Sequence, residues 1–193
     1  MTTAQYKRKY LNHDEITHLL RAIKDSRLAT RDRCMIYLSY IHGLRVSELT
    51  GLMMSDLDLQ SGNLFVRRLK KGMSTQQPLT NLEKDLLCEW LSLRNNFASD
   101  SCPWLFVTRE GNRMTRQRFY YLLKQLGVDA RLTISIHPHM LRHSCGYTLA
   151  NHGADTRLIQ DYLGHKNIRH TVIYTAANAN RFSRLWQQDK QTF

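Results

Sequence analysis

Residues 137–181 read HPHMLRHSCGYTLANHGADTRLIQDYLGHKNIRHTVIYTAANANR, and the glycines in this stretch divide it into helices. The sequence predicts a helix over about residues 139–152, which Gly153 breaks, and another over residues 155–163, which Gly164 ends. A segment around residues 171–178 and a closing helix over residues 180–188 follow. The last third of the chain is therefore expected to be helical.

The first third of the chain has the same character. Asn12 and Glu15 have the spacing of a capping box, which predicts a helix that opens at Asn12. The apolar stripe of this helix consists of Ile16, Leu19, Leu20 and Ile23. A second helix is predicted over residues 30–41, before a stop at Gly43, and a short helical turn over residues 45–49.

Residues 55–79 have a different pattern. DLDL at 56–59 alternates, LFV at 64–66 favours a strand, and the turn sequences SGN and KKG separate these from residues 74–79. This pattern predicts a small three-stranded meander. Thr80 and Glu83 form a second capping-box pattern, for a helix to about Arg94, and a helix over residues 115–126 follows. We expect one mainly α domain with a small three-stranded antiparallel sheet.

The charge balance indicates the class of partner. The 193 residues include 28 Lys+Arg and 16 Asp+Glu, a formal net charge of +12 at pH 7. A field of this sign attracts polyanions, so nucleic acid is the expected partner. No apolar run approaches the ~18 residues of a membrane-spanning helix, and the chain opens without an apolar signal stretch. We expect a cytoplasmic protein without a membrane partner.

The cysteines and histidines indicate no metal site. The four cysteines lie far apart and are expected to be reduced and mostly buried in the core: Cys34, Cys88, Cys102 and Cys145. The nine histidines show neither an H-E-x-x-H motif nor a Cys/His ligand spacing. No metal is therefore expected.

Two motifs combine arginines with possible partners. His139 and Arg142 are three residues apart and share one face of the predicted helix. In GLRVSEL, residues 43–49, Arg45 follows a glycine and Glu48 comes three residues later, where its carboxylate can orient the guanidinium. The Asp56/Asp58 pair is interpreted as surface charge on a strand.

Two further residues extend this set. His165 follows the end of a predicted helix in LGH, and Tyr174 stands nine residues later. Tyr120, Tyr121 and Tyr162 lie in predicted helices, and we interpret them as packing residues.

These motifs occur in a known order. GLRVSEL, LKKG in a hairpin turn, H-x-L-R-H, LGH and the downstream tyrosine together resemble the tyrosine recombinase (phage integrase) family. Residues 137–181, with RRLKKGMSTQQP at 67–78, are most similar to the small recombinases that invert the promoter element of bacterial fimbrial operons. The likeness spans most of residues 11–185 and implies the tyrosine recombinase catalytic-domain fold.

The resemblance implies a reaction. Tyr174 matches the family nucleophile, which attacks the scissile phosphate to give a 3′-phosphotyrosyl link and a free 5′-hydroxyl. Arg45 and Arg142 match the two arginines that bind the charged oxygens of the transition state. Glu48 would hold Arg45 in place.

The remaining catalytic positions handle protons. Lys70 matches the general-acid lysine, with its neighbour Lys71 as the alternative. His139 and His165 match the two family histidine positions, which handle the proton at the tyrosine and bond to the phosphate. The basic residues expected to contact DNA phosphates, or else solvent, are Lys7, Arg8, Lys9, Arg67, Arg68 and Lys71.

The expected organisation is a basic arm over residues 1–10, a catalytic domain over 11–178 and a C-terminal helix or tail over 179–193. Most family members carry a further N-terminal DNA-clamping domain, so here the catalytic domain is expected to grip DNA without one. Phe182, Leu185 and Trp186 are spaced to anchor the last helix, either on a neighbouring protomer or on its own core.

The resemblance implies a site-specific recombinase that inverts a promoter element between short inverted repeats and so switches fimbrial expression. Family members act as four protomers on two DNA sites, and accessory DNA-bending proteins are possible partners. The alternatives are a type IB topoisomerase and a catalytically silent DNA-binding regulator on the same scaffold.

Overall fold

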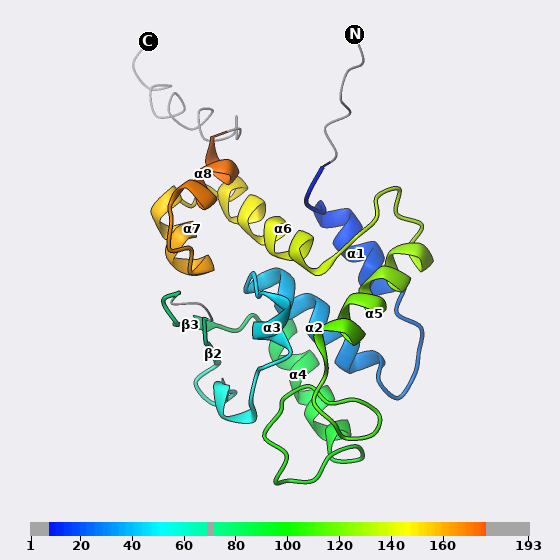
Figure 1. Cartoon of the computed structure of the whole chain (residues 1–193). Helices are drawn as coiled ribbons and strands as arrows, with labels where there is room; N and C mark the ends of the chain where they lie inside the picture. The colour runs from blue at the N-terminus through cyan, green and yellow to red at the C-terminus, as the bar shows by residue number, and fades with distance from the viewer. Residues whose placement is uncertain (1–7, 69–71, 177–193) are drawn as a thin grey trace, which may run out of the picture.

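The computed structural model describes residues 8–68 and 72–176 of the chain. The helices, in chain order, are α1 (His13–Arg21), α2 (Ala29–Ile41), α3 (Val46–Leu49), α4 (Asn81–Arg94), α5 (Arg116–Asp129), α6 (Pro138–Asn151), α7 (Thr156–Leu163) and α8 (Arg169–Thr175) (Figure 1). A 3-10 turn, η1 (Met54–Asp56), precedes the strands β1 (Leu57–Asp58), β2 (Asn63–Val66) and β3 (Thr75–Pro78).

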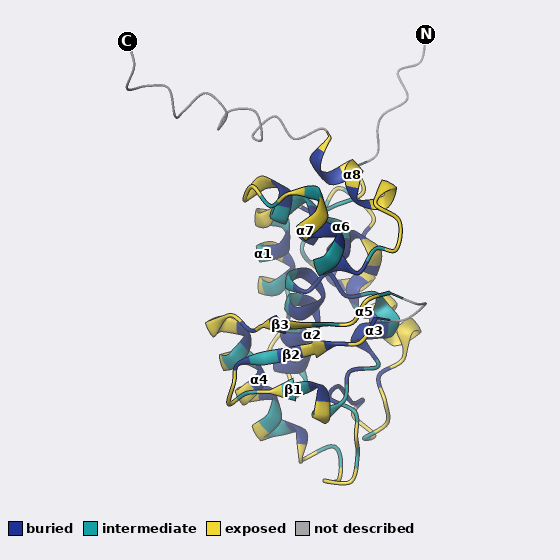
Figure 2. Ribbon diagram, turned by 90° about the vertical axis from the view of Figure 1, so that its left-hand side faces the viewer, coloured by how far each residue is buried: buried dark blue, intermediate teal, exposed yellow. Residues whose placement is uncertain are grey.

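The three strands form the predicted meander. Their order is β1-β2-β3, and both pairings are antiparallel, with Leu57 opposite Leu64 and Val66 opposite Thr75. Leu64 and Val66 are fully buried, whereas Phe65 between them is exposed. This alternation packs one face of the sheet on the helices and leaves the other in solvent, at one side of α2 and α3 (Figures 1 and 2).

Helix α2 lies at the centre of the fold. It contacts α4 on one side and α6 on another. Residues all around the helix are buried, among them Cys34, Met35, Ile36 and Leu38 (Figure 2). A helix buried on every side acts as the axis on which the others pack.

A separate apolar cluster joins α6, α7 and α8. Its buried members are Cys145, Ala150, Ile159, Leu163 and Tyr174. Because Tyr174 is itself a core residue of this cluster, the packing of the three helices sets the position of its ring.

The predicted helix signals are confirmed. Asn12 with Glu15 and Thr80 with Glu83 each form a complete capping box. Gly164 ends α7 in the left-handed conformation, with φ of 64°. The predicted closing helix over residues 180–188, with Phe182, Leu185 and Trp186, lies outside the described residues. None of the helices described between residues 8 and 176 has the length and hydropathy of a membrane span.

Some surface assignments were wrong. Tyr120 and Tyr121 do not pack in the core but are 38% and 60% exposed, because α5 turns Phe119 and Leu123 inward instead. Tyr162 does pack, half-buried, with its hydroxyl donating to the carbonyl of Ile41.

The acidic pair and the thiols also divide between core and surface. Asp56 is not strand-surface charge: it is buried, because its carboxylate accepts the backbone N–H of Met53 and pairs with Arg67, whereas Asp58 is exposed.

All four cysteines are free. Cys34 and Cys145 are buried as expected, but Cys88 is exposed.

The core predicts a local stability test. Trp90 of α4 is fully buried and its indole N–H donates to the carbonyl of Leu105, 2.9 Å away. We expect Trp90→Ala to lower the free energy of unfolding by about 3–5 kcal/mol in urea denaturation, because it leaves a cavity. Leu82→Ala, on the exposed side of the same helix, is the control. Equal losses in the two variants would contradict this packing.

Candidate active site

A buried carboxylate begins the site. Glu48 is the third residue of α3, and its Oε2 accepts the backbone N–H of Arg45 at 2.9 Å. Its Oε1 binds Nη1 of the same arginine at 2.6 Å. Glu48 thus closes the first turn of α3 and also directs the half-exposed Arg45 side chain, as the sequence motif suggested.

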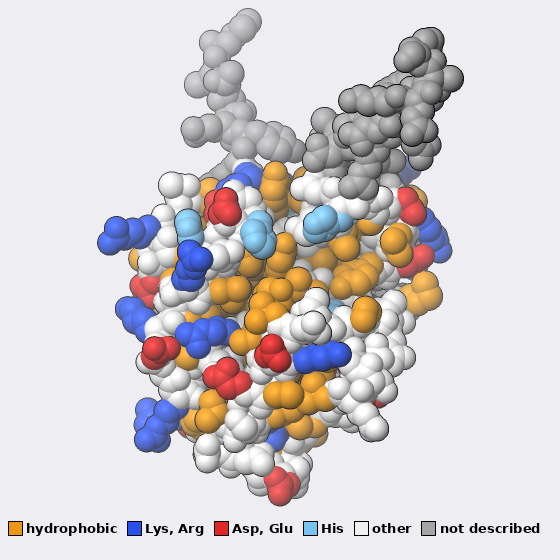
Figure 3. All heavy atoms as spheres, turned by 180° about the vertical axis from the view of Figure 1, so that it is seen from behind, with side chains coloured by type: hydrophobic (Ala, Val, Ile, Leu, Met, Phe, Trp, Pro, Cys, Tyr) orange, Lys and Arg blue, Asp and Glu red, His pale blue; other side chains and the backbone are white. Residues whose placement is uncertain are grey.

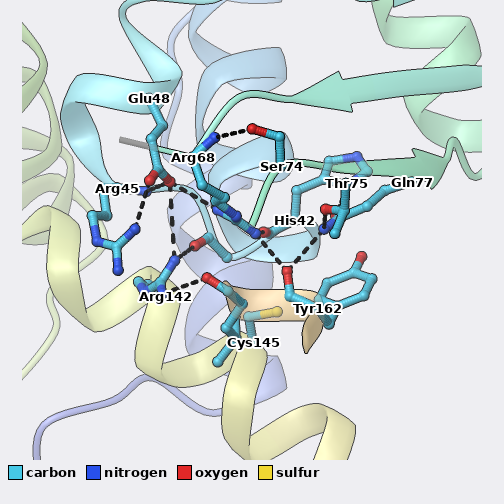
Figure 4. A network of polar contacts seen from close by, with 12 residues as sticks. His42, Arg45, Glu48, Arg68, Ser74, Thr75, Gln77, Arg142, Cys145 and Tyr162 are labelled. Atoms are coloured by element: carbon cyan, nitrogen blue, oxygen red, sulfur yellow. Dashed lines mark hydrogen bonds and ion pairs between the residues drawn. The ribbon is translucent and has the colours of Figure 1, made fainter. Parts of the chain in front are cut away.

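Two more arginines converge on the same carboxylate (Figure 4). Nη1 of Arg68 lies 2.8 Å from Glu48 Oε2, and Nη1 of Arg142 lies 4.0 Å from it. Both arginine side chains are buried. Burial alone would raise the pKa of Glu48, but the charge of Arg68 and the hydrogen bonds from Arg45 lower it. Glu48 is therefore ionised at neutral pH.

The cluster carries an excess of positive charge. Arg45, Arg68 and Arg142 surround one carboxylate, and burial together with the charges of Arg45 and Arg68 lowers the pKa of Arg142 to about 9. Such a cluster attracts an anion, and planar guanidiniums match the oxygens of a phosphate.

The C-terminal end of α7 fixes the buried arginines. Arg142 donates to the carbonyls of Gly43 and Leu163, and Arg68 donates to that of Tyr162 at 2.6 Å. Gln77 of β3 donates to the Tyr162 carbonyl as well, at 2.9 Å (Figure 4). The last carbonyls of a helix have no partner within the helix and lie at the negative end of its dipole, and these donors supply their hydrogen bonds.

Tyr174 of α8 packs on residues of α6 and α7. The residue is 2% exposed, and a Cβ added to Gly146 would lie 2.6 Å from its Cζ, so only glycine leaves room for the ring. The edge of Tyr147 packs on it, with ring centroids 5.2 Å apart. Burial raises the pKa of Tyr174 to about 12 although Arg142 opposes this effect, so the phenol is protonated at neutral pH.

Histidines line this tyrosine. His143 Nδ1 is 3.0 Å from the Tyr174 hydroxyl, and the ring of His165 lies parallel to the Tyr174 ring at 6.3 Å. His139, one turn before His143 on α6, is exposed, and the centroids of these two imidazoles are 4.6 Å apart. His165 is held by Thr171, whose Oγ1 is 2.9 Å from Nδ1.

Both inner histidines are neutral at pH 7. Burial, followed by the charges of His139 and Arg142, lowers the pKa of His143 to about 4. Burial and the charge of Arg142 lower the pKa of His165 to about 3. Neutral imidazoles can accept a proton, which a protonated nucleophile needs to lose.

The structure brings most of the expected site residues together. Arg45, Glu48 and Arg142 form one cluster, and His139, His165 and Tyr174 lie around α6 and α8 beside it. Lys7, Lys70 and Lys71 lie outside the described residues.

The other basic residues differ from one another. Arg8 pairs with Glu15, Lys9 is exposed, and Arg67 is half-exposed and bound to Asp56. Arg68 was expected at a DNA phosphate or in solvent, and this is wrong: its side chain is fully buried on Glu48.

Sequence reasoning assigned no role to His143, and it did not foresee the contact of the buried Arg68 with Glu48. The i, i+4 spacing of His139 and His143 was visible and places both imidazoles on one helix face. No local pattern indicated that Arg68 turns inward. Among residues 8–68 and 72–176, no group of His, Cys, Asp or Glu has the arrangement of a metal site.

An open hollow lies beside the exposed His139. It measures about 640 Å³ and lies between α3, α5 and α6, lined by Val46, Thr115, Arg116, Gln117, Tyr120, His137, Pro138 and His139.

Comparison with known proteins shows the family of the chain. The model of the phage integrase family matches residues 9–181. The type 1 fimbriae regulatory protein FimB of Escherichia coli K12 is 50% identical over 182 residues, which cover 94% of this chain and 91% of FimB. FimE of the same strain is 47% identical, with coverage of 95% and 93%. The tyrosine recombinase XerD of Oceanobacillus iheyensis is 38% identical, and the match covers 92% of this chain and 60% of XerD.

Solved structures show the same fold. The crystal structure of XerA recombinase superposes with a TM-score of 0.80 at 28% identity, over 97% of this chain and 67% of that chain. XerH recombinase bound to a palindromic difH substrate, in a post-cleavage complex, gives a TM-score of 0.77 at 24% identity, over 94% of this chain and 53% of that one. The expected mainly α fold with a three-stranded antiparallel sheet is confirmed as that of tyrosine recombinase catalytic domains.

The arginine cluster predicts a specific instability. In Glu48→Gln, buried guanidiniums lose their counter-charge, and we expect the free energy of unfolding to fall by about 3–5 kcal/mol in urea denaturation. Glu110→Gln is the matched control, since Glu110 and its partner Arg118 are exposed and solvent screens their ion pair, so this variant should lose little stability. A loss in Glu48→Gln no larger than in the control would contradict the assigned role.

The histidines predict a dependence on pH. The pKa values of His143 and His165 in the folded chain lie below the ordinary value, so the unfolded chain binds more protons in acid. Their stabilising contribution is complete above about pH 6.5 and decreases as the pH falls toward about 4 and 3. NMR titration should show both imidazoles still neutral at about pH 5.5. A midpoint near the ordinary value for either one would contradict this.

Proposed function

The chain belongs to the phage integrase family of tyrosine recombinases, and from this premise we propose that it is a site-specific DNA recombinase that switches fimbrial expression. Its similarity to FimB and FimE supports the fimbrial role, because about half of the residues are identical over nearly the whole length of both proteins. The DNA element inverted is a promoter between short inverted repeats. The observation that carries the chemistry is that the charge of Arg142, a member of the arginine cluster, acts on the Tyr174 hydroxyl and lowers its pKa against the effect of burial.

Tyr174 is the nucleophile of the proposed reaction. Its phenolic oxygen forms a bond to the scissile phosphorus while the bond from phosphorus to the 5′-oxygen breaks, which leaves a 3′-phosphotyrosyl link. Attack of the 5′-oxygen of another strand reverses these steps. The phosphotyrosyl link conserves the bond energy, so rejoining needs no nucleotide cofactor.

Arg45 and Arg142 bind the non-bridging oxygens of the phosphate. The transition state gathers negative charge on these oxygens, and donors that are already in place stabilise it without rearrangement. Glu48 keeps these donors in place, because it binds Arg45 directly and lies 4.0 Å from Arg142. His165, fixed by Thr171, supplies a further hydrogen bond to the phosphate.

The leaving 5′-oxygen takes a proton from Lys70, or from its neighbour Lys71. Both lie between β2 and β3, whose ends are attached to the site: Arg68 follows β2 and binds Glu48, and Gln77 of β3 binds the end of α7. The described residues on either side of this connection are thus bound to the arginine cluster and to the end of α7.

The substrate is double-stranded DNA with inverted repeats. The net charge of +12 supports a polyanionic partner. The XerH structure holds a palindromic DNA site, which supports inverted half-sites here. On the face opposite that of Figure 1, basic side chains are interspersed with acidic and apolar ones, so phosphate contacts there are scattered (Figure 3).

The proposed assembly is four protomers on two paired DNA sites, in the cytoplasm, with accessory DNA-bending proteins as further partners. Residues 1–10 serve as a basic arm on DNA, Lys7, Arg8 and Lys9 included. Residues 179–193 dock either on a neighbouring protomer or on the same chain, and residues 11–178 carry the catalysis.

Removal of one oxygen tests the nucleophile. Tyr174→Phe should form no covalent complex with a nicked suicide DNA in denaturing gels, whereas its affinity in gel shifts stays that of the parent. Tyr121→Phe, at an exposed tyrosine, is the control and should form the complex normally. A covalent complex with Tyr174→Phe would refute the assignment. Two other results would favour the alternative functions. Relaxation of a plasmid without inverted repeats would favour a type IB topoisomerase. DNA binding by the parent protein without cleavage would favour a silent regulator.

A substituted leaving group distinguishes the lysines. Alanine at the general acid should slow cleavage by about 10²–10⁴-fold. A DNA with sulfur in place of the scissile 5′-oxygen should restore the rate, because a thiolate leaves without a proton. We expect this restoration for Lys70→Ala and little slowing for Lys71→Ala. Slowing and rescue in Lys71→Ala alone would assign the acid to Lys71.

A further inference from the structure

The geometry points to His143 as the base that takes the phenolic proton of Tyr174 during DNA cleavage. This inference deepens the proposed function and rests on it, since it presupposes attack by Tyr174. The family resemblance assigned proton handling at the tyrosine to His139 instead.

The distance between the two groups is that of a direct hydrogen bond. Nδ1 of His143 lies 3.0 Å from the Tyr174 hydroxyl, which is within reach for proton transfer. The two residues are 31 positions apart in sequence and meet because α6 packs on α8. His143 therefore contacts the reacting oxygen itself.

The surroundings of Tyr174 hold its hydroxyl in this contact. Gly146 lies one turn after His143 on α6 and leaves the space that the ring fills. Tyr147 packs its edge on the ring from the same helix. A ring enclosed in this way keeps its hydroxyl directed at His143.

The other two histidines are less suitable as the base. The His165 ring lies parallel to the Tyr174 ring, with only 16° between the planes, and its Nδ1 is engaged by Thr171. The Tyr174 hydroxyl forms its hydrogen bond with His143, whereas its contact with His165 is between the two rings, whose centroids are 6.3 Å apart. His139 is exposed at the open hollow, where it can meet the phosphate instead.

The charge state of His143 fits an acceptor. Burial, His139, Arg142, His137 and Lys9 together lower its pKa to about 4, so the ring is neutral before DNA binds. A bound phosphate adds negative charge beside the ring and raises its proton affinity. The phenol proton becomes acidic as its oxygen bonds to phosphorus, which favours the transfer in the transition state.

The proton balance is complete. His143 begins with hydrogen on Nε2 and a free lone pair on Nδ1, accepts the proton from the phenol and becomes an imidazolium. When the strand is rejoined, the tyrosyl oxygen leaves phosphorus and takes the same proton back. One residue thus acts as base in cleavage and as acid in ligation.

The first test uses His143→Gln, whose amide can bond to the phenol but cannot take its proton. Cleavage of a nicked suicide DNA should slow by about 10²-fold or more, with unchanged affinity in gel shifts. His152→Gln, at an exposed position after the same helix, is the matched control and should cleave at the parent rate. Cleavage by His143→Gln within about threefold of the parent would overturn the proposal.

The second test separates proton transfer from structural support. Fluorinated tyrosine at position 174 has a more acidic phenol and should recover most of the lost rate in His143→Gln. A 5′-sulfur leaving group should not recover the rate, because it removes only the need for a general acid. Rescue by the sulfur substrate, or none by the fluorinated phenol, would contradict the assigned base.

A third measurement uses the unmodified protein and does not depend on how a variant folds. With ¹⁵N-labelled histidine, His143 should show an unprotonated Nδ1 and a protonated Nε2 at pH 7. The opposite tautomer would overturn the proposal. Failure of the proposed function has a different result, since the parent protein would then form no covalent complex on any DNA.

Discussion

The ion cluster around Glu48 is the constraint on which the rest of the site depends. A single ionised carboxylate holds Arg45 and Arg68 directly, with Arg142 4.0 Å away. These three arginines come from the start of α3, the end of β2 and the middle of α6. One negative charge thus joins three separate elements, and the surplus positive charge remains available to a phosphate.

The end of α7 provides the second junction. Its last carbonyls accept hydrogen bonds from Arg68, Gln77 and Arg142, and Gly164 then turns the chain toward His165 (Figure 4). The buried arginines and His165 therefore meet at one helix end. The proposed nucleophile, Tyr174, is itself packed in the core of α6, α7 and α8.

Local sequence patterns predicted most of the fold. The capping boxes at Asn12 and Thr80, and the stop at Gly164, are short-range signals whose physical cause lies within a few residues. Patterns of this range could not show which way a polar or aromatic side chain turns. Arg68 is buried because Glu48 and the end of α7 bind it, whereas Tyr120 is exposed because α5 turns Phe119 and Leu123 toward the core.

The sequence by itself determined the mainly helical class and the meander, and its spaced motifs led to the proposal of Arg45, Arg142, His165 and Tyr174 as site residues. Only the tertiary structure decided that His143 meets the Tyr174 hydroxyl and that Arg68 supports Glu48. The physical reason is that both contacts join residues on different elements, at separations of 31 and 20 positions. Contacts of this kind depend on how whole elements pack, which no periodicity within one element encodes.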